Sequence, residues 1–221
     1  MSISRTRLLE LVMSVLLRRG CDRDPLWLYY KYLIEQVIMN DPTKGCRFRS
    51  SRKEWAGFPS NKTLFGVDEG HGLPIGNLTS QLFSNVFLNV FDQYVKRVLK
   101  CRHYVRYVDD FCIVAGTREE LKALIEPIRC FLYDNLGLVL HPDKVWLHRQ
   151  EEGVPFLGYV VANGRRKMSK RGSKSLAASV TDALCFEVNP YSVRATINSY
   201  EGYVRHFDYG YRRWKDCIVR M

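Results

Sequence analysis

Two adjacent aspartates, Asp109 and Asp110, lie in the middle of an apolar stretch, RYVDDFCIVAG at residues 106–116, that is typical of half-buried strands. Burial of a carboxylate without a partner costs free energy, and a neighbouring like charge adds to that cost. A tight hairpin that exposes both carboxylates at its tip avoids the cost, and a divalent cation would supply the missing counter-charge. Because Mg²⁺ takes carboxylate oxygens and keeps water and substrate phosphates as further ligands, the pair favours a magnesium site. An Asp-Asp turn with both groups in water is the alternative.

A glycine- and proline-rich turn directly precedes a helix in HGLPIGNLTSQLFSNVFLNVFDQYVKR, residues 71–97. Free backbone N–H groups and the helix dipole at such a helix start favour phosphate. Gly72 and Gly76 would allow the backbone to approach a ligand closely. An ordinary connection between loop and helix would explain the glycines, although it would not explain the complete string.

The helix after this turn must present one face to a core. We expect Thr79 or Ser80 to cap its start, and we expect it to run to about Lys100. Its buried face is predicted to comprise Leu82, Phe83, Val86, Phe87, Val90 and Tyr94.

Periodicity and capping signals predict the remaining elements. Helices are expected at 5–19, where Gly20 ends the first, at 24–40, and from the Thr117-x-x-Glu120 capping box to Gly137. Strands are expected at 103–108, 111–115, 138–141, 144–148 and 154–161. Residues 41–77 lack periodicity and form a long loop that is rich in glycine and cations. From residue 165 the chain becomes basic, and it is then expected to be helical to its end.

The net charge favours a polyanionic partner. Lys and Arg number 34 against 23 Asp and Glu, which gives +11 at pH 7, although a basic protein without such a partner is the alternative. The basic stretches at 44–62 and 165–174 are the expected contacts with a phosphate backbone. The seven scattered cysteines form no CxxC pair, which favours reduced thiols in an intracellular, cytoplasmic protein. No apolar run reaches about 18 residues, so we expect no membrane span.

The motifs, taken in order, resemble those of reverse transcriptases. Gly76 to Ser80, followed by the helix, resemble the motif that contacts the nucleotide and the template, and Tyr107-Val108-Asp109-Asp110 resembles the metal-binding hairpin. Residues 140–144 resemble the segment whose lysine, here Lys144, lies near the incoming triphosphate. The resemblance implies nucleotide- or template-binding roles for Pro74, Ile75, Gly76, Ser80, Gln81 and Tyr107, and a primer-grip role for Phe156, Leu157, Gly158 and Tyr159.

Within that family, PIGNLTSQ at 74–81 and FPSNKTLF at 58–65 are most similar to the reverse transcriptases of diversity-generating retroelements. Group II intron enzymes carry Gln at the position of Ile75 and Ser-Pro at the position of Ser80-Gln81. If Ile75 lines the nucleotide pocket, its apolar side chain should relax base discrimination, because unpaired polar contacts are what reject a wrong partner.

The resemblance implies a chemistry that fits these residues. A primer 3′-hydroxyl attacks the α-phosphate of a deoxynucleoside triphosphate, and two Mg²⁺ ions, or Mn²⁺ as an alternative, hold the attacking and leaving oxygens. Asp109 is the first metal ligand, and Asp110 is either a second ligand or a support for the hairpin. Lys144 would neutralise or protonate the departing pyrophosphate, unless it only caps a strand end. The implied partners are an RNA template, a DNA or RNA primer, deoxynucleoside triphosphates and an accessory protein of the retroelement.

One feature of the family pattern is missing from the chain. The family has a further aspartate in a strand upstream of the helix at 5–19, where this sequence has no counterpart. We therefore expect an α+β fold. Residues 1–164 are expected to form a palm that lacks its first strand, with an antiparallel sheet, helices packed on one face of it and the basic loop 41–77. Residues 165–221 are expected to form the start of a helical thumb. The alternatives to a polymerase are a catalytically inactive remnant that only binds nucleic acid and a reverse-transcriptase-like antiphage defence protein.

Overall fold

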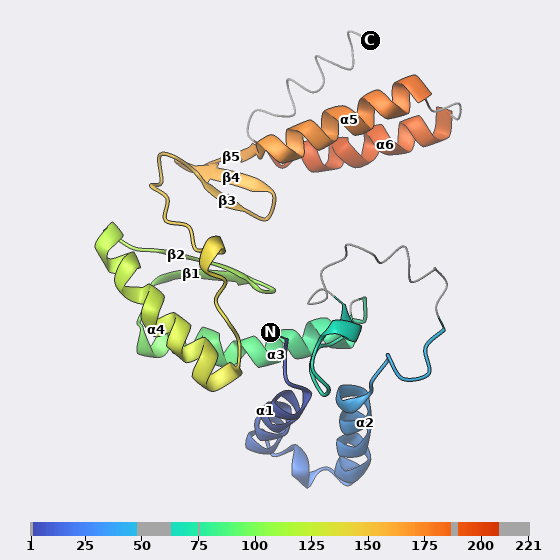
Figure 1. Ribbon diagram of the computed structural model, residues 1–221, viewed down its shortest axis with the longest axis vertical. Helices are drawn as coiled ribbons and strands as arrows, with labels where there is room; N and C mark the ends of the chain where they lie inside the picture. Colours follow the sequence, from blue (N-terminus) through green and yellow to red (C-terminus); the bar gives the residue numbers. More distant parts are fainter. Residues whose placement is uncertain (1, 48–62, 75, 187–189, 208–221) are drawn as a thin grey trace. The chain divides into compact units, whose positions relative to one another are not determined.

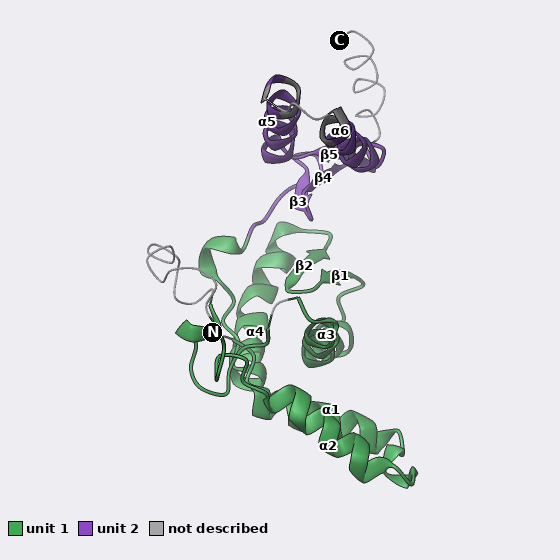
Figure 2. Ribbon diagram, turned by 90° about the vertical axis from the view of Figure 1, so that its right-hand side faces the viewer, with its two compact units in different colours: residues 1–145 green, residues 146–221 purple. Residues whose placement is uncertain are grey.

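The computed structural model describes residues 2–47, 63–74, 76–186 and 190–207 (Figure 1). The chain divides into two compact units, Met1–Val145 and Trp146–Met221, which Figure 2 colours separately. The first unit contains α1 (Arg5–Arg18), α2 (Trp27–Met39), α3 (Leu78–Gln93), β1 (His103–Tyr107), β2 (Asp110–Val114) and α4 (Arg118–Leu136). The second contains β3 (Val154–Phe156), β4 (Tyr159–Ala162), β5 (Arg165–Met168), α5 (Lys170–Phe186) and α6 (Pro190–Val204).

The strands pair antiparallel in both units. Strands β1 and β2 form a two-stranded ribbon, and β3, β4 and β5 form a separate sheet in that order. Together with the helices, these sheets confirm the expected mixture of helix and antiparallel strand. The boundary between the two compact units lies after residue 145. The expected palm–thumb boundary after residue 164 falls instead in the turn between the paired strands β4 and β5. The assignment of palm and thumb stays a prediction.

The core of the first unit lies where α1, α3 and α4 meet the ribbon. Its fully buried side chains include Leu8 of α1, Phe87 and Phe91 of α3, and Leu132 of α4. The ribbon covers this core with one face, where the rings of Tyr104 and Phe111 lie 6.1 and 5.0 Å from the ring of Phe91, centroid to centroid. Figure 1 shows the ribbon over α3 and α4.

The capping signals correctly indicated the end of α1 and both ends of α4. Helix α1 is followed by Gly20, whose left-handed backbone (φ 73°) ends it. At the start of α4, the Thr117 hydroxyl accepts a hydrogen bond from the Glu120 N–H, while the Glu120 carboxylate accepts one from the Gly116 N–H. Gly137 is left-handed (φ 63°) and closes α4. Helix α2 is shorter than expected, because residues 24–26 form a turn before Trp27.

The predicted start and buried face of α3 were both wrong in part. Asn77, rather than Thr79 or Ser80, is the residue before the first helical turn, because its backbone is extended while Leu78 is already helical. The α-helix ends at Gln93, and a π-helical turn carries the chain on to Val98. The fully buried side chains are Phe87, Leu88, Phe91 and Val95, whereas Leu82 is 58% exposed. The stripe that faces the core is therefore rotated from the predicted one, whose residues 83, 86, 90 and 94 lie half-buried along its flank.

The strand predictions after α4 were also wrong in part. Residues 138–141 and 144–148 form no strand, and a short 3₁₀ turn, Pro142–Lys144, separates them. Proline lacks the backbone N–H that a strand ladder requires, so Pro142 interrupts the apolar pattern. Residues 154–161 are two strands, β3 and β4, joined by a turn at Leu157 and Gly158. Strand β5 was not predicted, because its basic sequence RRKM carries little apolar alternation.

Aromatic side chains hold the second unit together. The ring of Tyr159 on β4 lies 5.7 Å from that of Tyr203 on α6 and 5.1 Å from that of Phe207, while Val204 is almost completely buried. The Tyr203 hydroxyl donates to the Gly158 carbonyl at 3.3 Å. No helix in the described part of the chain is long and apolar enough to cross a membrane.

Candidate active site

The paired aspartates occupy the β1–β2 turn and the position beside it. Tyr107 pairs with Asp110 across the ribbon, so Val108 and Asp109 alone make the turn. Both carboxylates are exposed, as predicted. Asp110, however, is the first residue of β2 and not part of the tip, a correction to the expected position. Because residues that pair directly share a face of the ribbon, Tyr107 and Asp110 lie on the same side of it.

The backbone of this turn is strained. Val108 has a φ of +54°, in the left-handed region. A β-branched side chain is rarely found there, because its Cβ crowds the following carbonyl, at a cost of roughly 1–2 kcal/mol. Strained residues persist only where surrounding contacts hold them, and they concentrate at functional sites. The strain at Val108 therefore indicates that contacts around the turn hold its backbone in place.

Helix α3 supplies an ion pair to the ribbon next to the turn. The guanidinium of Arg106 donates from Nε and Nη2 to the two carboxylate oxygens of Asp92, at 2.7 and 2.6 Å. The Tyr104 hydroxyl donates to Asp92 Oδ1 at 2.6 Å. The side chains of Arg106 and Asp92 are only 10% and 24% exposed. A half-buried, bidentate pair of this kind is geometrically specific and fixes β1 against α3.

The protonation states of this group follow from its contacts. Burial favours a neutral Asp92 carboxyl, but the hydrogen bonds from Arg106 and Tyr104, with the Arg106 charge, hold the pKa of Asp92 below its usual range. Burial, together with the hydrogen bond to Asp92, raises the pKa of Tyr104. The hydrogen bonds to Asp92 raise the pKa of Arg106 further. At neutral pH, Asp92 is thus a carboxylate and Arg106 a cation.

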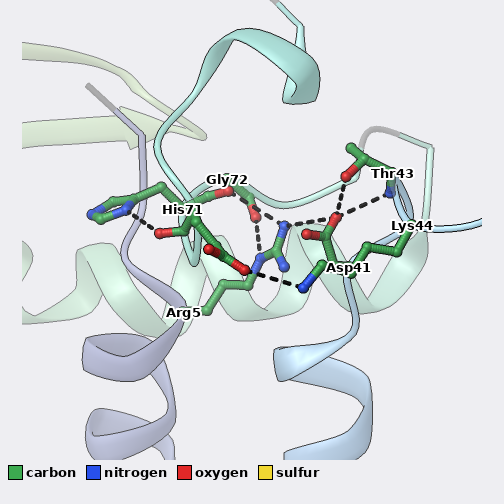
Figure 3. A network of polar contacts seen from close by, with 7 residues as sticks. Arg5, Asp41, Thr43, Lys44, His71 and Gly72 are labelled. Atoms are coloured by element: carbon green, nitrogen blue, oxygen red, sulfur yellow. Dashed lines mark hydrogen bonds and ion pairs between the residues drawn. The ribbon is translucent and has the colours of Figure 1, made fainter.

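A second buried arginine fixes the loop that leads to α3 (Figure 3). The side chain of Arg5 is 4% exposed, and its Nε donates to the Gly72 carbonyl at 2.9 Å and its Nη2 to the His71 carbonyl at 3.4 Å. The Asp41 carboxylate lies 3.9 Å from the same guanidinium and accepts from the Thr43 hydroxyl and N–H. These hydrogen bonds from Thr43, with the Arg5 charge, keep the pKa of Asp41 low. The loop before α3 is thereby attached to the start of α1 and the end of α2.

The predicted nucleotide-binding residues lie at the start of α3. Pro74 is half-buried, Gly76 is exposed with a φ of +99°, Ser80 is buried in the first turn and Gln81 is exposed. Ile75 lies outside the described residues. A Cβ added to Gly76 would meet nothing within 4 Å, so the left-handed backbone is what requires glycine there.

Gly72 packs closely against a neighbouring side chain, and its predicted approach to a ligand stays a prediction. A Cβ at this position would lie 2.7 Å from Leu64 Cδ2. The absence of a side chain therefore lets the loop pack on Leu64, and Gly72 is buried.

The structure brings only some of the remaining predicted residues near one another. Tyr107 is 59% exposed and shares a ribbon face with Asp110. Lys144 is exposed at the end of the Pro142–Lys144 turn in the first unit. The predicted primer-grip residues Phe156, Leu157, Gly158 and Tyr159 form the β3–β4 turn in the second unit.

Asp109 and Asp110 are the residues at this site that fit a divalent cation. Their carboxylates are hard oxygen donors, exposed at one end of the ribbon, which suits Mg²⁺ with water and phosphate as remaining ligands. Within the described ranges, no group of three or more His, Cys, Asp or Glu side chains gathers into a metal site.

Comparison with known proteins identifies the family. Residues 34–161 match the family described as reverse transcriptase (RNA-dependent DNA polymerase), so the chain belongs to the reverse transcriptase family. Membership implies a polymerase palm, in agreement with the α+β elements described above.

Three known proteins are similar to parts of this chain. Protein YkfC of Escherichia coli is 31% identical over 141 residues, 49% of this chain and 36% of YkfC. The putative COX1/OXI3 intron 2 protein of Saccharomyces cerevisiae is 41% identical over 63 residues, 28% of this chain and 7% of its own length. The group II intron-encoded protein LtrA of Lactococcus lactis is 34% identical over 79 residues, 35% of this chain and 13% of LtrA. These matches take in about a third or less of each relative.

The motifs in the sequence did not indicate the hydrogen-bonded group beside the turn, namely Asn85, Asp92 and Arg106. A signal for them was present, because Asn85 and Asp92 are seven residues apart and so share one face of α3. Both accept hydrogen bonds from the same side chain on β1. The partner, Arg106, directly precedes the Tyr-Val-Asp-Asp motif.

Proposed function

We propose that the chain is part of an RNA-directed DNA polymerase of a retroelement, which adds deoxynucleotides to a DNA or RNA primer on an RNA template. The observation that carries this proposal is the strained, exposed turn with two adjacent carboxylates, fixed to the helix that follows the glycine-rich loop. Membership of the reverse transcriptase family supports the same activity.

In this proposal, Asp109 and Asp110 hold two Mg²⁺ ions, or Mn²⁺, through their exposed carboxylates. Bound there, the ions would stabilise charge on the attacking and leaving oxygens during nucleotidyl transfer. Tyr107, exposed on the same face as Asp110, would contact the primer terminus. Lys144 would neutralise the departing pyrophosphate with its exposed ammonium group.

The start of α3 is proposed to bind the incoming nucleotide and template. Pro74, Gly76, Ser80 and Gln81 lie in or beside its first turn, where backbone N–H groups favour phosphate. Ile75 would line the nucleotide pocket and relax base discrimination. Ile75→Gln should therefore lower misincorporation, and an unchanged error spectrum would remove this part of the proposal.

Phosphate contacts are proposed for the basic segment that begins at β5. Six cations fall within residues 165–174, and no acid lies between residues 153 and 181. The neighbouring turn at 156–159 would grip the primer. Affinity for nucleic acid should therefore fall steeply with salt, since released counterions drive such binding.

The type of retroelement is proposed from the motif at 74–81, which resembles that of diversity-generating retroelements. An accessory protein and a cytoplasmic location belong to the same proposal. A template repeat and a variable repeat beside the gene are the expected genomic sign. An antiphage gene cluster in their place would contradict the retroelement assignment.

Primer extension on an RNA template tests the polymerase activity. We expect the isolated chain to incorporate little or no deoxynucleotide with Mg²⁺, because the family chemistry draws a further carboxylate from a separate strand. Addition of an upstream segment that carries such a strand should restore incorporation. Nucleic-acid binding without incorporation in both experiments would favour the inactive, binding-only alternative.

A further inference from the structure

The side chain of Arg106 touches the acidic turn itself as well as α3. Its Nη1 donates to the carbonyl oxygen of Val108 at 2.7 Å and to Asn85 Oδ1 at 3.1 Å. Its other two nitrogens are engaged by Asp92. One guanidinium therefore joins two residues of α3 to the strained residue of the turn.

The direction of this contact matters because the guanidinium is rigid. Its planar fork is oriented by both oxygens of Asp92, so the two N–H groups of Nη1 point in defined directions. The Val108 carbonyl and Asn85 Oδ1 lie in those directions. The carbonyl of a residue moves when its backbone leaves the left-handed region, so the hydrogen bond is lost if Val108 relaxes to an ordinary φ.

We propose that Arg106 is a positioning residue, which holds the Val108–Asp109 turn in its left-handed form and so sets where Asp109 and Asp110 lie relative to α3. The helix α3 begins at the proposed nucleotide-binding loop, so the contact links the two motifs of the site. The purpose of this link rests on the proposed polymerase function, whereas the support of the turn is a property of the folded chain.

The variant Arg106→Lys tests the support directly in the full chain. Lysine keeps the charge beside Asp92, but its single ammonium cannot satisfy Asp92, Asn85 and the Val108 carbonyl in the same geometry. NMR should show loss of the cross-strand contact between Tyr107 and Asp110 and a changed backbone coupling constant at Val108. The apparent affinity of the hairpin for Mn²⁺, measured by paramagnetic broadening of its amides, should fall about tenfold.

Tyr104→Phe is the matched control. It removes a hydrogen bond to the same Asp92 but leaves the contact between Arg106 and Val108 intact. We expect a lower melting temperature with unchanged turn signals and unchanged Mn²⁺ broadening. Equal changes in the turn for both variants would mean that Arg106 acts only through general stability, and would overturn the proposal.

A second substitution provides rescue. Glycine adopts a left-handed backbone without support, so Arg106→Lys combined with Val108→Gly should recover the Tyr107–Asp110 contact and most of the Mn²⁺ affinity. A role limited to adhesion between β1 and α3 would not be rescued in this way. An Arg106→Lys chain with wild-type turn signals, or a double variant without recovery, would refute the assignment.

The same measurements separate this inference from the polymerase proposal. If the turn responds to Arg106→Lys as expected, but Mn²⁺ broadens none of the wild-type hairpin amides even with primer–template and deoxynucleoside triphosphate, the polymerase proposal fails. The support of the turn by Arg106 then stands. If Mn²⁺ binds but the turn ignores Arg106→Lys, the positioning role fails and the metal site stands.

Discussion

The β1–β2 turn and the β4–β5 turn connect antiparallel strands with two residues each, yet their residues differ in kind. Asn163 and Gly164 of the β4–β5 turn both have a positive φ, 49° and 71°. Asparagine and glycine adopt that backbone readily, and Asn-Gly is a strong hairpin signal. Val108 adopts a similar φ of 54° with a β-branched side chain that disfavours it. The β4–β5 turn therefore needs no outside support, whereas the β1–β2 turn receives a hydrogen bond from Arg106.

The charges at the two turns differ as well. Asp109 and Asp110 make the strained turn acidic, whereas Arg165, Arg166 and Lys167 follow the relaxed turn along β5. Backbone strain at Val108 and the hydrogen bond from Arg106 thus coincide with the proposed catalytic carboxylates. The basic strand β5, by contrast, follows an unstrained Asn-Gly turn.

The largest effect is expected from the acidic turn. Under conditions in which the chain extends a primer, Asp109→Asn should lower the rate of Mg²⁺-dependent incorporation about a thousandfold, because it removes a metal ligand worth several kcal/mol in the transition state. RNA affinity, measured by filter binding, should change little. Asp134→Asn on the exposed face of α4 is the control and should leave the rate unchanged. Comparable losses from both changes would contradict the assignment of the site.

The basic segment after the relaxed turn should control affinity instead. Replacement of Lys167, Lys170 and Lys174 by Gln should reduce the salt dependence of log K for single-stranded RNA by about 2 and weaken binding about a hundredfold at 0.1 M salt. Three lysines of the first unit, Lys31, Lys100 and Lys122, form a charge-matched control. Their replacement by Gln should change the slope far less. An equal change of slope would mean that net charge, and not this segment, binds the RNA.

The ion pair beside the strained turn should contribute the next largest effect. Asp92→Asn leaves the half-buried Arg106 without its counter-charge and should lower the free energy of unfolding by about 2 kcal/mol. Because the pKa of Asp92 is lowered in the folded chain, its contribution is present above about pH 4 and is lost as pH falls through the lowered pKa. Urea unfolding of Asp92→Asn should therefore depend less on pH below 4.

The control for this prediction is an exposed pair of the same chemistry. Glu126 and Arg129 are paired on the surface of α4, where their side chains are 66% and 45% exposed. Glu126→Gln should change the free energy of unfolding by less than about 0.5 kcal/mol. A similar loss in both variants would show that the position of Asp92 beside the turn has no special weight.

Short sequence signals predicted the elements whose formation depends mainly on residues close in the sequence. The capping box at Thr117 and the glycine at 137 defined α4, and apolar residues around the two aspartates predicted the ribbon. Family resemblance then indicated which carboxylates matter. Strand β5 escaped prediction because its basic residues become a strand only through pairing with β4, although Asn163-Gly164 could have signalled the hairpin.

The support of the turn could not be predicted from the motif alone. Arg106 directly precedes the Tyr-Val-Asp-Asp motif, but its contacts with Asp92 and Asn85 form only when β1 packs on α3. Nor does a valine in the motif indicate a left-handed backbone, since valine favours the extended one. The same reasoning explains why Leu82 was assigned to the core: the exact stripe of α3 is decided by packing against the ribbon.

The smallest effects are expected from Val108→Gly, which places a glycine in the β1–β2 turn, and from Gly164→Ala, which removes the glycine of the β4–β5 turn. These two variants compare the turns most directly. Val108→Gly should raise the free energy of unfolding by about 0.5–1 kcal/mol, because the relieved left-handed strain exceeds the entropy that glycine adds to the unfolded chain. Val108 is 43% exposed, so little packing is lost.

Gly164→Ala should have the opposite sign, a loss of about 1 kcal/mol, since a Cβ there meets nothing within 4 Å and only the backbone strain acts. Chemical unfolding of each full-length variant measures both values. If the two changes have the same sign, Val108 is not strained relative to Gly164, and the support assigned to Arg106 loses its physical reason. If the two changes in the free energy of unfolding have opposite signs, and if Val108→Gly stabilises the Arg106→Lys chain more than the wild-type chain, then Arg106 stabilises the strained backbone of Val108.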